Sequence, residues 1–269
     1  MSAKITFIGA GNMASSLAGG LIAKGFDSTQ ITMTDLNDDL LLHNRTTLGV
    51  NTTRDNTLAC SHADVIIFAV KPQVMEAVAT PLKDIIKQRS PLLVSIAAGI
   101  TLNNLSTWLG ESAPIVRCMP NTPALVQTGA TGLFANEYVS DTQKKLAKDV
   151  LSAVGLALWV ESEDQIDAVT ALSGSGPAYF LLVMEAMMEA GRSLGLPDSV
   201  ASQLTLQTAL GSAQLAITSD VDAAELRRRV TSPGGTTERA INIMQDNELK
   251  AIFAEAIKGA YDRSKELAS

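Results

Sequence analysis

The sequence has few of the residues that build metal sites and disulfide frameworks. Its 269 residues include only two cysteines and two histidines, at Cys60, Cys118, His43 and His62. No two of them stand at the short spacings of a zinc site, and two distant cysteines give no disulfide framework. We therefore expect no bound metal, and we expect both cysteines to be reduced core thiols of a cytoplasmic protein.

Positive charge and long apolar runs are also scarce. The formal net charge is -7, and the single basic tract, Arg227–Arg229, follows acidic residues as it would on a solvated helix face. No apolar run reaches the length of a membrane-spanning helix, and the stretch before the first glycines is too short for a signal peptide. We expect neither nucleic acid nor membrane among the partners.

A glycine-rich motif follows directly after the first predicted strand. Residues 9–14 read Gly-Ala-Gly-Asn-Met-Ala, and apolar residues at helical spacing come next. This order of strand, Gly-x-Gly-x-x-Ala and helix is the fingerprint of dinucleotide binding. We expect Gly9, Gly11, Asn12 and Met13 to contact a nucleotide. The alternative is a glycine-rich turn in some other α/β protein.

Strands and helices alternate over the first part of the chain, and helices alone follow. We expect strands at Ile5–Ile8, Ile31–Thr34, Val65–Val70, Leu92–Ala97, Ile115–Met119, Ala130–Ala135 and Leu156–Val160. The helices expected between the first strands lie at Asn12–Lys24, Asp38–Leu48, Val74–Lys87 and Leu102–Leu109, the last with Thr101 as its cap, and those expected nearest the C-terminus lie at Thr236–Asp246 and Leu249–Leu267. The sequence predicts an α/β protein with an N-terminal Rossmann domain, a doubly wound parallel sheet, over residues 1–162. An all-helical domain occupies residues 163–269. Its helix at 178–194 is apolar nearly all round, which indicates cover by a second subunit.

Three polar residues follow predicted strands, at the edge of the sheet where ligands bind in such folds. Asp35 stands about twenty residues after the glycines, where a carboxylate holds the ribose hydroxyls of NAD and repels a 2′-phosphate. Capping of the next helix is its alternative role. Lys71 and Asn121 follow two later strands. The alternative for Lys71 is an ordinary solvated side chain, and the alternative for Asn121 is a stiff turn flanked by prolines.

A second loop, residues 231–237, reads Thr-Ser-Pro-Gly-Gly-Thr-Thr and opens onto a predicted helix. Free N–H groups and the positive end of the helix dipole favour a small anion there, and the glycines permit its close approach. An ordinary loop and cap is the alternative. The chain shows no Ser–His–Asp set and no obvious general base for a hydroxyl proton. An imine substrate needs no strong base.

Together these motifs closely resemble those of pyrroline-5-carboxylate reductase. The match covers essentially the whole chain and is carried by residues 7–14, 69–72, 119–123, 173–179 and 232–237. The resemblance implies reduction of 1-pyrroline-5-carboxylate to L-proline by NADPH or NADH, the last step of proline biosynthesis. It also implies a homodimer with interleaved C-terminal helices, which can assemble into larger rings, and a substrate site between subunits.

The resemblance also assigns site residues. The substrate carboxylate is expected on Ser232, Gly234, Gly235, Thr236 and Thr237, with the catalytic Thr237 hydroxyl near the ring nitrogen; the cofactor is expected on Asn56, Ala69, Val70, Lys71, Pro72 and Asn121 as well as the glycine motif and Asp35. Family members often carry a pair such as Asn-Arg after the second strand and favour NADPH. Here Asp35 leaves the choice open.

Two other functions remain open at this stage. One is an oxidoreductase similar to a 3-hydroxyacid dehydrogenase, which has a comparable two-domain plan. The lack of a lysine within the apolar helix at 178–194 argues against it. The other is a non-catalytic nucleotide-binding regulatory protein, against which the complete substrate loop argues.

Overall fold

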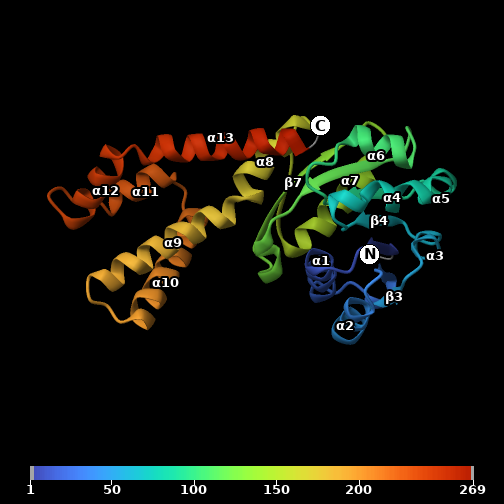
Figure 1. Ribbon diagram of the computed structural model, residues 1–269, viewed down its shortest axis with the longest axis horizontal. Coiled ribbons are helices and arrows are strands. Elements are labelled where there is room, and N and C mark those ends of the chain that lie inside the picture. The colour runs from blue at the N-terminus through green and yellow to red at the C-terminus, as the bar shows by residue number, and fades with distance from the viewer. Residues whose placement is uncertain (1–2, 268–269) are drawn as a thin grey trace. The chain divides into compact units, whose positions relative to one another are not determined.

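The computed structural model describes residues 3–267, and its strands form one 8-stranded sheet in the order β3-β2-β1-β4-β5-β6-β7-β8 (Figure 1). The strands are β1 (Ile5–Ile8), β2 (Ile31–Thr34), β3 (Asn51–Thr53), β4 (Val65–Phe68), β5 (Leu92–Ser95), β6 (Ile115–Met119), β7 (Gly129–Ala135) and β8 (Gly155–Trp159). Neighbouring strands run parallel except β6 and β7. The first six strands have the order of a doubly wound dinucleotide fold, so the predicted fold class is confirmed.

Helices cover both faces of the sheet, and helices alone follow the last strand in the described chain. They are α1 (Asn12–Ala23), α2 (Asp38–Leu48), α3 (Asn56–Cys60), α4 (Met75–Ala79), α5 (Lys83–Arg89), α6 (Leu102–Leu109), α7 (Asp141–Leu151), α8 (Asp164–Val169), α9 (Gly176–Ser193), α10 (Asp198–Thr218), α11 (Ala223–Arg229), α12 (Thr236–Asp246) and α13 (Leu249–Leu267). From Asp164 to Leu267, the described chain contains no strand, as the apolar pattern predicts.

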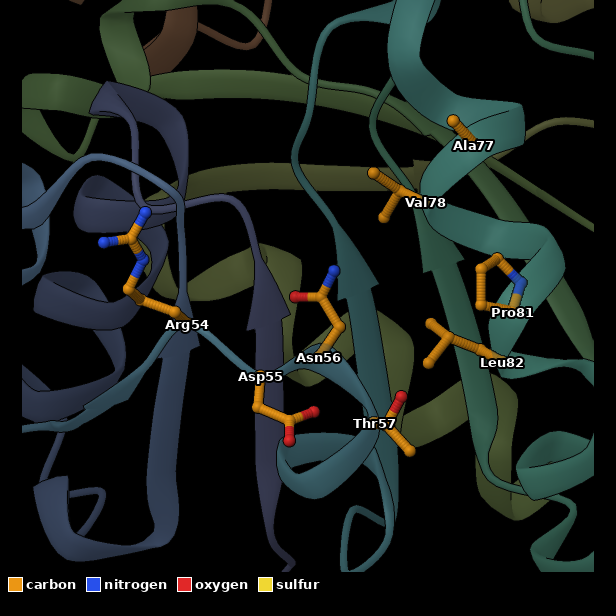
Figure 2. A pocket seen from close by; sticks show the side chains of 8 residues that line it. All are labelled: Arg54, Asp55, Asn56, Thr57, Ala77, Val78, Pro81 and Leu82. Atoms are coloured by element: carbon orange, nitrogen blue, oxygen red, sulfur yellow. The ribbon is translucent and has the colours of Figure 1, made fainter.

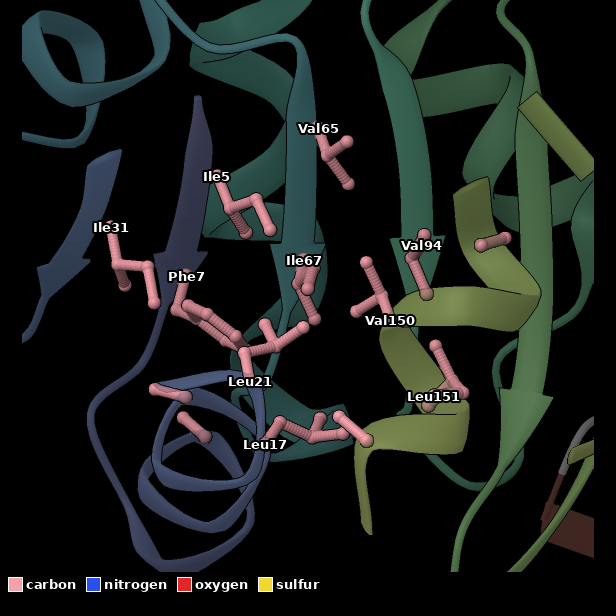
Figure 3. Packing of buried hydrophobic residues seen from close by; sticks show 14 of the residues in the cluster. Ile5, Phe7, Leu17, Leu21, Ile31, Val65, Ile67, Val94, Val150 and Leu151 are labelled. Atoms are coloured by element: carbon pink, nitrogen blue, oxygen red, sulfur yellow. The ribbon is translucent and has the colours of Figure 1, made fainter. Parts of the chain in front are cut away.

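Two apolar cores hold the helices to opposite faces of the sheet. Successive strand residues point to opposite faces, so alternate residues of one strand enter different cores. Phe7, Ile67 and Val94 belong to the core that α1, α2 and α7 cover, where Leu21 and Val150 meet them (Figure 3). The opposite core lies under α3 to α6. Burial of the strands on both faces explains why they are continuously apolar.

Three details of the first part differ from the sequence prediction. The short strand β3 was not expected, because its Asn-Thr-Thr sequence has no apolar pattern and it lies at the edge of the sheet. The helix expected over residues 74–87 is divided into α4 and α5 by a 3₁₀ turn at Thr80–Leu82, where Pro81 cannot donate a helical hydrogen bond. The strand β7 is antiparallel to β6, so the sheet is mostly parallel rather than wholly so.

The described chain forms two compact units. One contains the residues up to Ser175 together with those from Ala260 onward; the other contains Gly176–Gly259. The last part of α13 therefore packs with the sheet-containing unit, although the helix begins in the other one. The domain boundary predicted between residues 162 and 163 stays a prediction.

A buried ion cluster fastens the end of α13 within the sheet-containing unit. Arg117 of β6 is 2% exposed; its Nη1 lies 2.8 Å from Glu163 Oε1 and its Nη2 lies 3.7 Å from Asp167 Oδ1. Ser264 of α13 donates to Asp167 at 2.6 Å, and the amide of Leu102, at the start of α6, donates to Glu163 at 2.7 Å. Arg117 thus pairs with two carboxylates, and these accept hydrogen bonds from the start of α6 and from α13.

One sequence expectation is wrong on its own criterion. The continuous helical run Asp164–Ser193 is 30 residues long and contains an 18-residue window with mean hydropathy 1.3, so by length and composition alone it is long and apolar enough to cross a membrane. Sequence inspection missed it because small residues such as Gly174 and Ser175 divide the apolar side chains into two shorter runs. An apolar helix covered by a partner subunit has the same composition.

Candidate cofactor and substrate sites

The glycine loop lies where β1 ends and α1 begins. Gly9 has φ +100°, and its amide donates to the carbonyl of Thr34 at 2.8 Å. A Cβ added to Gly9 would lie 2.5 Å from the carbonyl oxygen of Ala69, after β4. Only glycine fits there, so its first role is to let two loops at the carboxyl edge of the sheet approach each other.

Gly11 has the opposite environment. Its φ of -75° and ψ of -176° suit any residue, and a Cβ at this position would meet nothing within 4 Å. No side chain caps α1, and the amides of Gly11, Asn12 and Met13 have no acceptor among residues 3–267. Three free N–H groups at a helix N-terminus, beside open space, are suited to a pyrophosphate.

Asp35 lies behind the glycine loop, at the end of β2. Its Oδ2 accepts the N–H of Ala10 at 2.9 Å, and its Oδ1 accepts the N–H of Asn37 at 3.0 Å. The capping residue of α2 is Asn37, which accepts the amides of Asp39 and Leu40. The alternative in which Asp35 caps α2 is therefore wrong: one oxygen of its carboxylate accepts the amide of Ala10 in the glycine loop.

An open hollow of about 490 Å³ lies in the sheet-containing unit, beside α3 and α4. Figure 2 shows Arg54 and Asn56 on one side of it and Ala77, Val78, Pro81 and Leu82 on the other. Arg54 also forms an exposed ion pair with Asp38 at 3.2 Å. The hollow combines an amide, a guanidinium and an apolar wall. Asn56, which is expected to contact the cofactor, therefore lines a hollow whose volume suits part of a nucleotide.

The Ala69–Pro72 segment follows β4 at the same sheet edge as the glycine loop. Lys71 is exposed and forms no ion pair with residues 3–267, while Pro72 begins a 3₁₀ turn. Parallel strands end at a common edge, so this segment, Asp35 and the glycine loop are brought together as the sequence predicts.

Asn121 is used within the protein. Its Nδ2 donates to the carbonyl of Ser173 at 3.0 Å, and its Oδ1 accepts the amide of Ala130 at 2.8 Å. The contact with Ser173 falls in a π-helical turn, Thr170–Gly174, where a Cβ on Gly174 would lie 2.8 Å from Met119 Cε. These contacts favour the stiff-turn interpretation of Asn121. A role in cofactor binding stays a prediction.

The second glycine loop lies in the other compact unit and opens α12. Gly234 adopts φ +72°, and the amide of Gly235 donates to the carbonyl of Ser232 at 3.0 Å. No side chain caps α12, and the amides of Thr236 and Thr237 have no acceptor among residues 3–267. The donors left for an anion are these two amides and the exposed hydroxyls of the loop.

Sequence reasoning missed Glu238 in this loop. Its Oε2 accepts the amide of Gly234 at 2.7 Å, a reach-back from the first turn of α12 similar to that of a capping box. The signal was present, since Glu238 is the third residue of the helix. The amides of Gly234 and Gly235 are both used inside the loop, so these glycines shape it rather than donate from it.

Neither cysteine is available for chemistry. Cys60 and Cys118 are free and buried, as expected. Burial raises the pKa of the Cys60 thiol to about 12, with a smaller contribution from Asp55, and burial alone raises the pKa of Cys118. Among residues 3–267, no group of three or more His, Cys, Asp and Glu side chains is placed to hold a metal ion.

A doubly wound sheet with free amides at its first glycine loop defines a class, the dinucleotide-binding proteins. Residues 163–267 match the family model for pyrroline-5-carboxylate reductase dimerisation, and residues 4–99 match the model described as NADP oxidoreductase coenzyme F420-dependent. The first match supports homo-oligomerisation through the helical part.

Similar proteins extend these matches to the whole chain. Pyrroline-5-carboxylate reductase of Pseudomonas aeruginosa is 53% identical over 265 residues, which cover 98% of this chain and 97% of that protein. The structure of a pyrroline-5-carboxylate reductase from Coxiella burnetii has a TM-score of 0.97 and 47% identity over 100% of both chains. The Plasmodium falciparum pyrroline carboxylate reductase structure with NADP bound has a TM-score of 0.87, 30% identity and 99% and 98% coverage. The chain belongs to the pyrroline-5-carboxylate reductase family and is an NAD(P)-dependent oxidoreductase.

Proposed function

We propose that this chain reduces 1-pyrroline-5-carboxylate to L-proline with NAD(P)H, the last step of proline biosynthesis. The observation that carries the proposal is the similarity to pyrroline-5-carboxylate reductases, at 53% identity in one relative, over nearly the whole chain. When bound, the nicotinamide supplies a hydride to the imine carbon. The ring nitrogen takes up a proton, and a secondary amine results.

The residues of the first glycine loop fit the dinucleotide. The amides of Gly11, Asn12 and Met13 bind its pyrophosphate, and the absence of a side chain on Gly11 leaves space for it. Asp35 lies beside the ribose, and Asn56 with the Ala69–Pro72 segment borders the rest of the nucleotide. These residues bind and orient the cofactor, and none of them transfers a proton.

The second glycine loop binds the substrate carboxylate. The amides of Thr236 and Thr237 and the hydroxyl of Ser232 donate to it, while Gly234 and Gly235 give the loop its shape. Each charge-assisted hydrogen bond contributes about 1.5–3 kcal/mol, so two or three account for the roughly 4–8 kcal/mol of a millimolar-to-micromolar substrate. The Thr237 hydroxyl lies near the ring nitrogen, and catalysis comes mainly from proximity and orientation.

The functional unit is a homodimer with interleaved C-terminal helices, located in the cytoplasm, and such dimers can assemble further into a ring. The support is the family match of residues 163–267 and the many apolar side chains that α9 and α10 expose in the isolated chain. Phe180 and Ile217, for example, are 70% and 84% exposed. A partner that covers such surfaces gains hydrophobic stabilisation.

The test is to follow oxidation of NADH and NADPH by the purified protein with 1-pyrroline-5-carboxylate, to identify proline as the product, and to follow reduction of NAD+ and NADP+ with 3-hydroxy acids. Turnover with this imine and none with 3-hydroxy acids is the expected result. Oxidation of a 3-hydroxy acid would instead support the dehydrogenase-like alternative. Cofactor binding without turnover of either substrate would support a non-catalytic nucleotide-binding protein.

A further inference from the structure

A polar side chain lies in the core directly behind the cofactor loop. Asn44 of α2 is 0% exposed, and its Nδ2 donates to the carbonyl of Ala10 at 3.0 Å and to that of Leu40 at 2.9 Å. Its Oδ1 has no partner among residues 3–267. Since both acceptors are carbonyls, the amide cannot be reversed without placing oxygen against oxygen. A leucine of similar size would fill this core without an unpaired oxygen.

The contact with Ala10 sets the direction of a neighbouring N–H group. The carbonyl of Ala10 and the amide of Gly11 belong to one planar trans peptide, in which C=O and N–H point in opposite directions. Asn44 holds the carbonyl toward the core, so the N–H of Gly11 points away from Asn44 and from the core. Asp35 holds the preceding peptide through the N–H of Ala10.

Flexibility at the flanking residues makes this restraint necessary. Ala10 stands between Gly9 and Gly11, whose backbones have more freedom than those of other residues. Without a hydrogen bond from the core, the Ala10–Gly11 peptide could rotate and turn its carbonyl dipole toward the bound phosphates. Among residues 3–267, the one other side-chain hydrogen bond to this carbonyl is a 3.4 Å contact from the hydroxyl of Ser15.

We propose that Asn44 is a positioning residue for the nicotinamide cofactor: it fixes the Ala10–Gly11 peptide so that the Gly11 amide donates to the pyrophosphate. Asn44 does not touch the cofactor itself, and the inference rests on the proposed function of the glycine loop. It explains why a buried amide with an unpaired oxygen stands in a helix face that is otherwise apolar.

The test is Asn44→Leu, with Asn44→Ala as a second variant that adds no bulk. We expect the Kd for NADPH or NADH, measured by calorimetry without substrate, to rise about tenfold or more as one charge-assisted hydrogen bond is misaligned. At saturating cofactor, the KM for 1-pyrroline-5-carboxylate should stay within about twofold. The Tm of both variants should fall, because the buried carbonyl of Ala10 loses its hydrogen-bond donor, so the Kd is measured at a temperature at which both variants are folded.

Leu41→Ala is the matched control, since Leu41 is buried on the same helix and makes no hydrogen bond to the loop through its side chain. It should lower the Tm and leave the cofactor Kd unchanged. An unchanged cofactor Kd in both Asn44 variants would overturn the proposal, whatever their Tm. Because the Kd is measured without substrate, this result is independent of whether wild type reduces the imine.

Discussion

At the scale of single residues, Gly9 and Gly11 of the first glycine loop must be glycines for two different physical reasons. Gly9 is required by the fold, since a Cβ there would collide with the carbonyl of Ala69, whereas Gly11 faces open space in allowed backbone geometry.

We predict that Gly11→Val folds and dimerises normally but loses cofactor binding, because the side chain fills the pyrophosphate position. Calorimetry with NADPH and NADH and a thermal melt check this. Near-normal affinity would show that the loop is only a turn.

We predict that Asp35 decides between the two cofactors. Because its carboxylate is directed to the nucleotide loop, we expect it to accept from a free ribose hydroxyl and to repel a 2′-phosphate. NADH should then be used at least as well as NADPH. Asp35→Ser should shift the ratio of kcat/KM values toward NADPH by roughly tenfold, since one partly screened repulsion amounts to about 1–2 kcal/mol.

Asn37→Ala is the control for Asp35→Ser. It removes the cap of α2 and should cost about 0.5–2 kcal/mol of stability without changing the cofactor ratio. The role assigned to Asp35 would be contradicted if the wild type strongly preferred NADPH and Asp35→Ser had the same ratio of kcat/KM values for the two cofactors. Arg54, which pairs with the exposed Asp38, would then be the cation to examine next.

Thr237 offers the corresponding test in the substrate loop. We predict that Thr237→Val lowers kcat/KM for the imine by about 10- to 150-fold, the kinetic equivalent of one charge-assisted hydrogen bond. Stability should barely change, because the side chain is exposed at the opening of α12. Thr237→Ser keeps a hydroxyl and should recover most of the activity. Equal kcat/KM in the valine variant and the wild type would remove Thr237 from the site.

At the scale of elements, apolar periodicity predicted nearly all of the fold. The bounds of β1, β2, β6, α2, α6, α12 and α13 agree with the sequence prediction, because each has a continuous apolar run or a clear cap such as Thr101. The polar strand β3 has no such signal in its sequence. It is held in place by its pairing with β2, which only the folded sheet provides. The break at Pro81 was readable but overlooked.

The same limit applies to the candidate site. Both glycine loops could be predicted, because their function depends on local backbone. The contacts of Asn44 with Ala10 and of Arg117 with Glu163 could not, since the partners are 34 and 46 residues apart and only the folded sheet brings them together.

The cluster on Arg117 predicts a large effect on stability. Arg117→Leu would leave the carboxylates of Glu163 and Asp167 in the protein without their cation, and removal of one partner from a buried ion pair costs about 3–5 kcal/mol. Denaturant unfolding of the variant measures this. Lys145→Ala, which breaks an exposed pair with Asp149, is the control and should change stability by less than about 1 kcal/mol. A similarly small change in Arg117→Leu would show that the cluster does not fasten the C-terminal end of α13.

At the scale of the whole molecule, the two compact units differ in how they bury apolar surface. The sheet-containing unit encloses two apolar cores, whereas the helices of Gly176–Gly259 leave large side chains exposed. No described residue of α11 or α12 is buried in the isolated chain. A helical unit that cannot bury its apolar faces alone depends on a partner for its stability, which agrees with its match to a dimerisation domain.

Because the helical unit depends on a partner, we expect a change that weakens the subunit contact to lower both the mass of the oligomer and its stability. We expect the Tm of the wild type to rise with protein concentration, and Phe180→Asp to shift the mass toward the monomer and to lower the Tm. Phe180 is 70% exposed on α9 in the isolated chain, so a charge there harms a subunit contact rather than the core of one chain. Leu42→Asp is the control, because Leu42 is 62% exposed on α2, outside the helical unit, and should change neither mass nor Tm appreciably. Sedimentation and thermal melts at two concentrations measure both quantities. If Phe180→Asp kept the mass and Tm of the wild type, α9 would lie outside the subunit interface.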